Sequence, residues 1–135
     1  MRIMAVDYGD ARTGVAVSDE SAAIVGQAWV INEKSMQKVA GALAEEASAR
    51  NVSCIIIGYP KNMNGTIGPR GEKSEQLLEL LSTQCAADIK LWDERLSTVS
   101  ANRILADAGK GGKKRKKTVD AVAASIILES YLNSL

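Results

Sequence analysis

The sequence contains no histidine and only two cysteines among its 135 residues. Acid–base catalysis by histidine is therefore excluded, and so is a zinc site of the usual cysteine and histidine type. Cys54 and Cys85 have no CxxC spacing, so we expect two reduced thiols and no disulfide framework. If the protein performs catalysis, we favour carboxylates that hold a hard divalent cation.

Aromatic residues and long apolar runs are also scarce. An aromatic content of 4% argues against a single-strand nucleic-acid platform built on stacked rings. No apolar run approaches the length of a membrane span and no signal peptide is visible, so we expect a cytoplasmic protein without a membrane partner. An apolar content of 46% in 135 residues suits one domain, covering residues 1–135.

Hydrophobic periodicity predicts an α/β protein. Strand patterns lie at residues 2–7, 14–19, 24–31, 52–57 and 89–92. Helical spacing lies at residues 36–47, 74–81, 101–108 and 119–127, and Asn32 or Ser35 is a suitable cap for the first helix. Short links join the first three strands, whereas helices separate the later ones. We therefore expect a mixed five-stranded sheet with helices on both faces and the first, fourth and fifth strands parallel.

Acidic residues lie at the ends of three of these elements. Asp7 closes the first strand, Glu94 follows the fifth, and Asp120 is expected to open the last helix. Ligands in such sheets bind beyond the carboxyl ends of the parallel strands, where residues 7–9, 58–60 and 93–95 should meet. Asp7 could instead cap a turn, and Asp120 could be a first-turn acid favoured by the helix dipole. Asp93 competes with Glu94 because consecutive residues point apart; we favour Glu94.

Four segments carry a resemblance to a known family. DYGDARTGVAVSD, GYPKNMNGT, WDERLST and TVDAVAASIIL occur in the order and spacing of the YqgF/RuvX family, which the chain resembles over essentially its whole length. That family belongs to the RNase H-like superfamily and is related to the RuvC Holliday-junction resolvases. The resemblance implies the strand order 3-2-1-4-5 and a nuclease linked to 5′-end processing of precursor 16S rRNA, in ribosome biogenesis. It assigns the catalytic acids to Asp7, Glu94 and Asp120.

The chain departs from the RuvC pattern directly after the fourth strand. RuvC-type enzymes carry an acid there, whereas this chain has Gly58, Tyr59 and Pro60. Glu94 would therefore have to substitute for the missing acid. Another acid, Asp19, should lie roughly 16 Å from Asp7 at about 3.3 Å per residue, so we interpret it as a solvated or cross-strand charge.

Carboxylates suit the cleavage of a phosphodiester, which is anionic and repels hydroxide. Two divalent ions about 4 Å apart can hold both the attacking water and the leaving oxygen. Magnesium prefers oxygen ligands, so we expect Mg²⁺ or Mn²⁺ as the cofactor. Asp7 would anchor the metal, Asp120 would complete the site, and Glu94 would ligate a metal or orient the water. Gly14 should lie opposite Asp7 and leave room for a metal or phosphate.

Basic and aromatic side chains near these acids are the candidate substrate contacts. A basic run at residues 110–117 is expected to form a loop at the mouth of the site, where it would attract a polyanion. The arginines could bind phosphate or form structural ion pairs, and Tyr8 and Tyr59 could stack on the substrate or pack their loop. The predicted substrate-binding residues are Arg12, Tyr59, Arg95, Lys113, Lys114, Arg115, Lys116 and Lys117.

Several functional hypotheses remain open. We favour structured RNA over a DNA junction as substrate and expect a monomer or weak homodimer. A Holliday-junction resolvase-like DNA endonuclease is the second hypothesis and would require a two-fold dimer. A ribosome-assembly factor that binds nucleic acid with little or no cleavage is the third. A sugar-kinase or actin fold would require a duplicated domain, for which 135 residues are too few.

Overall fold

The computed structural model describes residues 1–97 and 113–135, with the backbone alone for 113–118. The elements follow the order β1 (Arg2–Asp7), β2 (Arg12–Ser18), β3 (Val25–Asn32), α1 (Met36–Ala49), β4 (Val52–Tyr59), α2 (Pro69–Ser82), β5 (Asp88–Asp93), the 3₁₀ helix η1 (Glu94–Leu96) and α4 (Lys113–Asn133). The predicted helix at 101–108 and residues 110–112 of the basic run lie outside the described residues.

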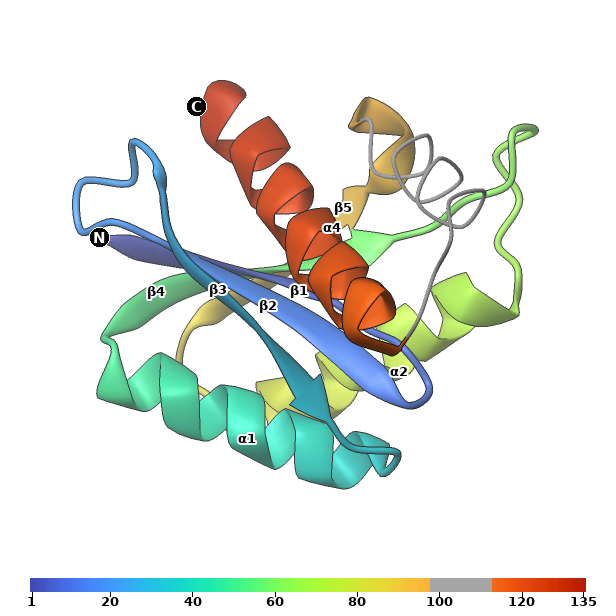
Figure 1. The fold of residues 1–135 in the computed structure, drawn as a ribbon, viewed down its shortest axis with the longest axis horizontal. Helices are drawn as coiled ribbons and strands as arrows, with labels where there is room; N and C mark the ends of the chain where they lie inside the picture. The colour runs from blue at the N-terminus through green and yellow to red at the C-terminus, as the bar shows by residue number, and fades with distance from the viewer. Residues whose placement is uncertain (98–112) are drawn as a thin grey trace.

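The five strands form one mixed sheet in the order β3-β2-β1-β4-β5. β1 pairs in parallel with β4, and β4 with β5, whereas β2 is antiparallel to both β1 and β3. Helices α1 and α2 cover one face of this sheet, and α4 crosses the other face (Figure 1). The expected fold class, strand order and strand directions are therefore confirmed.

Alternation along the strands divides the core into two layers. Met4 and Val6 of β1 belong to the apolar layer beneath α1 and α2. Ile3 and Ala5 belong to the layer beneath α4. Because side chains alternate along a strand, Asp7 continues the second series and faces α4. The α4 face of the sheet therefore carries the candidate site.

Two helix boundaries differ from the predictions. Helix α4 begins at Lys113, so residues 113–117 do not form the expected loop and Asp120 does not open the helix. Lysine and arginine are good helix formers, and no glycine or proline interrupts residues 113–120. Helix α2 begins at Pro69 instead of residue 74, with proline in the first turn, where its missing N–H has no consequence. The first-turn explanation for Asp120 is consequently wrong.

Smaller features agree with the sequence. Ser35 caps α1 by accepting a hydrogen bond from the backbone N–H of Lys38 at 3.4 Å. Cys54 and Cys85 are both free thiols. Within the described part of the chain, every helix is too short or too polar to cross a bilayer.

Candidate functional site

Asp7 lies at the carboxyl end of the central strand and is buried, with an exposed fraction of 4%. Its partner across the β1–β2 pair is Gly14, as predicted. Directly opposed residues in an antiparallel pair project to the same face, with Cα atoms about 4.5–5.5 Å apart. The position that a Gly14 side chain would occupy therefore lies beside Asp7 on the α4 face.

Helix α4 approaches the sheet closely at Gly14. A Cβ atom built on Gly14 would lie 2.0 Å from the backbone oxygen of Asp120 and 2.6 Å from its carbonyl carbon. Only a residue without a side chain permits this contact. Gly14 thus brings the backbone of Asp120 next to Asp7, although the two acids are far apart in sequence.

Glu94 reaches the same face from the opposite side of Asp7. Its side chain is buried, with an exposed fraction of 3%, and its Oε2 lies 3.2 Å from the position of a Cβ built on Gly58. Val6 pairs with Ile57, so Gly58 continues the register beside Asp7, at a strand spacing of about 4.8 Å. The Glu94 carboxylate, together with the nearer Ile127 Cδ1 at 2.7 Å, therefore borders the space that a Gly58 side chain would fill.

Asp93, the competitor of Glu94 for the site, has basic partners of its own. The Nε and Nη2 atoms of Arg95 donate to the Asp93 carboxylate at 2.8–3.1 Å, and the Arg95 backbone N–H donates at 2.9 Å. Lys61 lies 4.0 Å from the same carboxylate. The hydrogen bonds from Arg95 and the neighbouring positive charges lower the pKa of Asp93. Asp93 is thus a structural ion-pair partner.

The third acid, Asp120, is held by Arg12. The Arg12 Nε donates to Asp120 Oδ2 at 3.2 Å, and the two side chains are 29% and 21% exposed. Among the residues that the structure describes, no group of three acidic, cysteine or histidine side chains is arranged to hold a metal ion. The three acids therefore share one region of the α4 face without forming a complete chelating group.

The donors present nevertheless suit a magnesium-type cation in part. Asp7 and Glu94 offer buried carboxylate oxygens, the ligand type that Mg²⁺ prefers. Gly14 and Gly58 flank Asp7, and because they have no side chains the Asp120 backbone and the Glu94 carboxylate can lie close to them. Asp120 would complete a three-carboxylate set only after a change in its contact with Arg12. Asp7 and Glu94 are thus suited to hold a divalent cation as they stand, whereas Asp120 is suited only if its contact with Arg12 changes.

The candidate substrate-binding residues have structural partners of their own. Arg12 and Arg95 both form ion pairs, which agrees with one of their two interpretations and leaves a phosphate contact untested. The Tyr59 hydroxyl donates to Glu75 at 2.7 Å, a bond that is the main reason its pKa is raised. Side chains 113–117 are outside the described part of the structure.

Asp19 takes no part in the site and caps its own turn. Its carboxylate accepts hydrogen bonds from the backbone N–H groups of Ala23 and Ile24 at 2.8 and 3.0 Å and from the Ser21 hydroxyl. These bonds, that of Ser21 first, lower the pKa of Asp19 to about 2. These bonds lie at the exposed surface, which agrees with the solvated interpretation of Asp19, and the carboxylate caps its local turn as well.

The loop after β4 contains a hairpin that the sequence analysis missed. Asn62 and Thr66 are joined by a backbone hydrogen bond of 2.9 Å, and Gly65 has a φ of +85°. Met63 stands at the tip and is 99% exposed. The Asn64-Gly65 dipeptide is a hairpin signal that could have revealed it.

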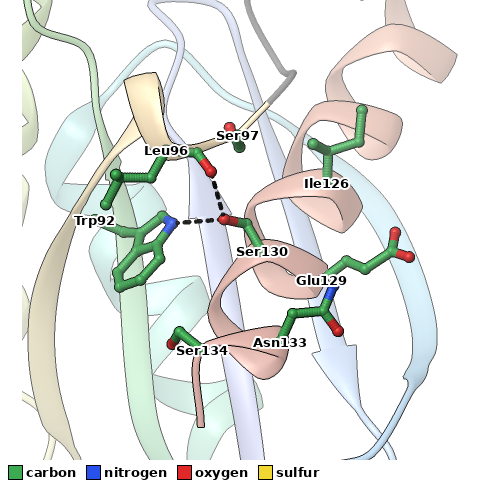
Figure 2. A pocket seen from close by; sticks show the side chains of 8 residues that line it. All are labelled: Trp92, Leu96, Ser97, Ile126, Glu129, Ser130, Asn133 and Ser134. Atoms are coloured by element: carbon green, nitrogen blue, oxygen red, sulfur yellow. Dashed lines mark hydrogen bonds between the residues drawn. The ribbon is translucent and has the colours of Figure 1, made fainter.

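A hollow of about 650 Å³ separates η1 from the carboxyl-terminal half of α4. Figure 2 shows Ser130 at its centre, where its Oγ accepts from the Trp92 indole N–H at 3.2 Å and donates to the Leu96 backbone oxygen at 3.1 Å. These bonds connect β5 and η1 to α4, and so help to position Glu94. No sequence motif singled out Ser130.

Comparison with known proteins agrees with this architecture. A family model described as "RuvX: Holliday junction resolvase" matches residues 1–134. A Halothermothrix orenii protein named "Putative pre-16S rRNA nuclease" is 45% identical, covering 98% of this chain and 95% of its own. A Clostridium novyi protein of the same name is 42% identical over the full length of both.

Two solved structures share the fold at low sequence identity. Thermus thermophilus RuvC, in complex with a Holliday junction substrate, superposes with a TM-score of 0.62 at 10% identity, covering 99% of this chain and 96% of that one. The fowlpox virus Holliday junction resolvase gives 0.57 at 15% identity, with full coverage of both chains. The fold is thus that of the RuvC-like, RNase H-type resolvases, and the chain belongs to the RuvX family.

Proposed function

We propose that this protein, as a single RNase H-like domain, is a divalent-metal-dependent nuclease that processes the 5′ end of precursor 16S rRNA in the cytoplasm. The observation that carries the proposal is the position of Asp7. Its buried carboxylate lies between Gly14 and Gly58, with the Glu94 carboxylate over one glycine and the Asp120 backbone against the other. The RNA assignment rests on the names of relatives that are 41–45% identical over nearly their whole length.

Each acid has a distinct part in the proposed reaction. Asp7, on the central strand, and Glu94, fixed through η1, would hold Mg²⁺ or Mn²⁺ by their oxygen atoms. The bound cation would neutralise charge on the phosphate and lower the pKa of a water that attacks it. Gly14 and Gly58 allow Asp120 and Glu94 to approach Asp7 closely, and Asp120 would complete the ligand set.

Positive side chains would hold the substrate at this edge of the sheet. Arg12 pairs with Asp120, and Arg95 pairs with Asp93, which directly precedes Glu94. Both arginines could bind phosphate oxygens. The basic residues 113–117 form the first turns of α4, the helix that carries Asp120. We expect them to bind the backbone of structured RNA without reading its sequence.

A second candidate function is cleavage of a four-way DNA junction. The description of the matching family and the fold shared with two resolvases favour it. Both functions would use the same acids, so substrate preference alone separates them. The binding-only hypothesis differs from both because it predicts no metal-dependent cutting.

The experiment compares labelled precursor 16S rRNA with a labelled four-way DNA junction, each in Mg²⁺, Mn²⁺ or chelator. We expect cutting near the mature 5′ end of the RNA with either metal and none with chelator. Asp7→Asn and Glu94→Gln should abolish cutting, whereas the matched control Asp93→Asn should retain it. Preferential cutting of the junction would establish the resolvase instead. Binding of both substrates without cutting would leave an assembly factor.

A further inference from the structure

Arg12 and Gly14 hold different parts of Asp120 from the same strand. The two residues are separated by one position on β2 and therefore share the α4 face. Gly14 contacts the Asp120 backbone, whereas the Arg12 Nε holds its Oδ2 at 3.2 Å. The backbone of Asp120 is thus fixed beside Asp7 while its carboxylate is engaged by Arg12.

The geometry points to Arg12 as a positioning residue that makes assembly of the metal site depend on the substrate. In the free protein Arg12 retains the Asp120 carboxylate. A substrate phosphodiester would then bind the guanidinium, and the Asp120 carboxylate would be released to hold a divalent cation together with Asp7 and Glu94. This inference rests on the proposed function and adds an order to it, in which full metal ligation follows phosphate binding.

The chemistry of the three partners makes this exchange feasible. A guanidinium matches a phosphate with two parallel hydrogen bonds, and Arg12 contacts Asp120 through its Nε at 3.2 Å. The pair is partly exposed, and ion pairs of this kind are weak. Displacement by an anionic phosphate therefore costs little, and the freed carboxylate gains a dication as its partner.

The exchange predicts that metal and phosphate bind cooperatively. If breaking the Arg12–Asp120 pair costs what a partly exposed ion pair is worth, metal affinity in the free protein is reduced by roughly two- to fivefold. By linkage, phosphate binding must increase metal affinity by the same factor by which metal increases phosphate affinity. An ion pair that merely anchors α4 would produce no such coupling.

The test measures the Mn²⁺ affinity of the full chain by electron paramagnetic resonance of free Mn²⁺, with and without dimethyl phosphate. Dimethyl phosphate is a simple phosphodiester, and its effect on Mn²⁺ binding can be measured without any cleavage reaction. For the wild type we expect it to tighten Mn²⁺ binding roughly two- to fivefold. Without dimethyl phosphate, the Arg12→Gln variant should bind Mn²⁺ roughly two- to fivefold more tightly than the wild type. Addition of dimethyl phosphate should change its Mn²⁺ affinity little. The response of Arg12→Lys to dimethyl phosphate should fall between those of the wild type and Arg12→Gln. Lysine keeps the positive charge but lacks the paired N–H donors of the guanidinium.

Controls separate this mechanism from the general effect of removing a positive charge. Lys61→Gln removes an equal charge beside Asp93, the neighbour of Glu94 in sequence, and should leave the response to dimethyl phosphate intact. Asp120→Asn should abolish the gain in affinity in the Arg12→Gln background but change the wild type little, as a double-mutant cycle measures. Thermal melting would verify that each variant is folded.

The outcomes distinguish this inference from the function on which it rests. Wild-type Mn²⁺ binding that Arg12→Gln leaves unchanged or weakens would overturn the role of Arg12 and leave the nuclease proposal standing. Equal tightening in Arg12→Gln and Lys61→Gln, with no phosphate coupling in the wild type, would do the same. Absence of Mn²⁺ binding in every folded variant would overturn both.

Discussion

Replacement of Gly14 by alanine tests how the fold builds the site. The added Cβ would lie 2.0 Å from the Asp120 backbone oxygen, whereas ordinary contacts of this kind begin at about 3.4 Å. The atoms that the Cβ would meet belong to the Asp120 backbone and cannot rotate away as a side chain can. Helix α4 therefore has to move away from β2 by about 1 Å or more. Overpacking of this kind costs about 1–3 kcal/mol of folding free energy. At about 4 °C per kcal/mol for a chain of this size, Tm should fall by roughly 4–12 °C.

The same displacement should affect catalysis more strongly than stability. It moves Asp120 relative to Asp7 by about 1 Å, and a misplacement of that size costs about 100-fold in rate. The assay combines a thermal melt with RNA cleavage at a temperature where the variant is fully folded. We expect Gly14→Ala to be folded and about 100-fold slower.

A matched substitution in α1 gives the control. A Cβ at Gly41 would contact only Gln84 Oε1, at 3.8 Å. Gly41→Ala should therefore stabilise the helix by about 0.5–1 kcal/mol and leave cleavage unchanged. A Gly14→Ala protein as stable and active as the wild type would refute the close approach of α4 at this position.

Three further substitutions probe other parts of the structure. Gly58→Ala places a Cβ 3.2 Å from Glu94 Oε2 and 2.7 Å from the Ile127 Cδ1 methyl, which can move. We expect this variant to cleave more slowly with only a small change in Tm. Unaltered cleavage kinetics would contradict the placement of Glu94. Ser35→Ala removes the cap of α1 and should cost about 1 kcal/mol in a denaturant titration; no loss would mean that the hydrogen bond is not maintained. Asp19→Ala should lower Tm at pH 7, because a carboxyl pKa depressed from 3.8 to about 2 contributes stability above pH 4 that is lost as the pH falls through about 2. The difference from the wild type should therefore close near pH 2, and a gap independent of pH would argue against the turn cap.

Local patterns were sufficient for most of the sheet. Alternation and continuous apolar runs located all five strands, because a half-buried or fully buried strand leaves a repeating signal in the sequence. The strand order came from the family motifs and was confirmed. The position of Gly14 opposite Asp7 followed from the short connection between their strands, which fixes the register.

Contacts between distant segments left no local signal. Arg12 and Asp120 are 108 residues apart, and nothing in either segment indicates their ion pair. The placement of the Glu94 carboxylate over Gly58 similarly depends on how β5 and η1 pack against α4. The start of α4 was missed for a different reason, since a run of lysine and arginine reads as solvated loop although these residues favour helix.

Anomalous diffraction from crystals soaked in Mn²⁺ tests the central claim most directly. If Asp7 and Glu94 form a divalent-cation site, a manganese peak should appear on the α4 face beside Gly58, within about 2.0–2.4 Å of an oxygen from each carboxylate. Manganese peaks found only elsewhere on the protein, with both carboxylates ordered and unligated, would contradict the account.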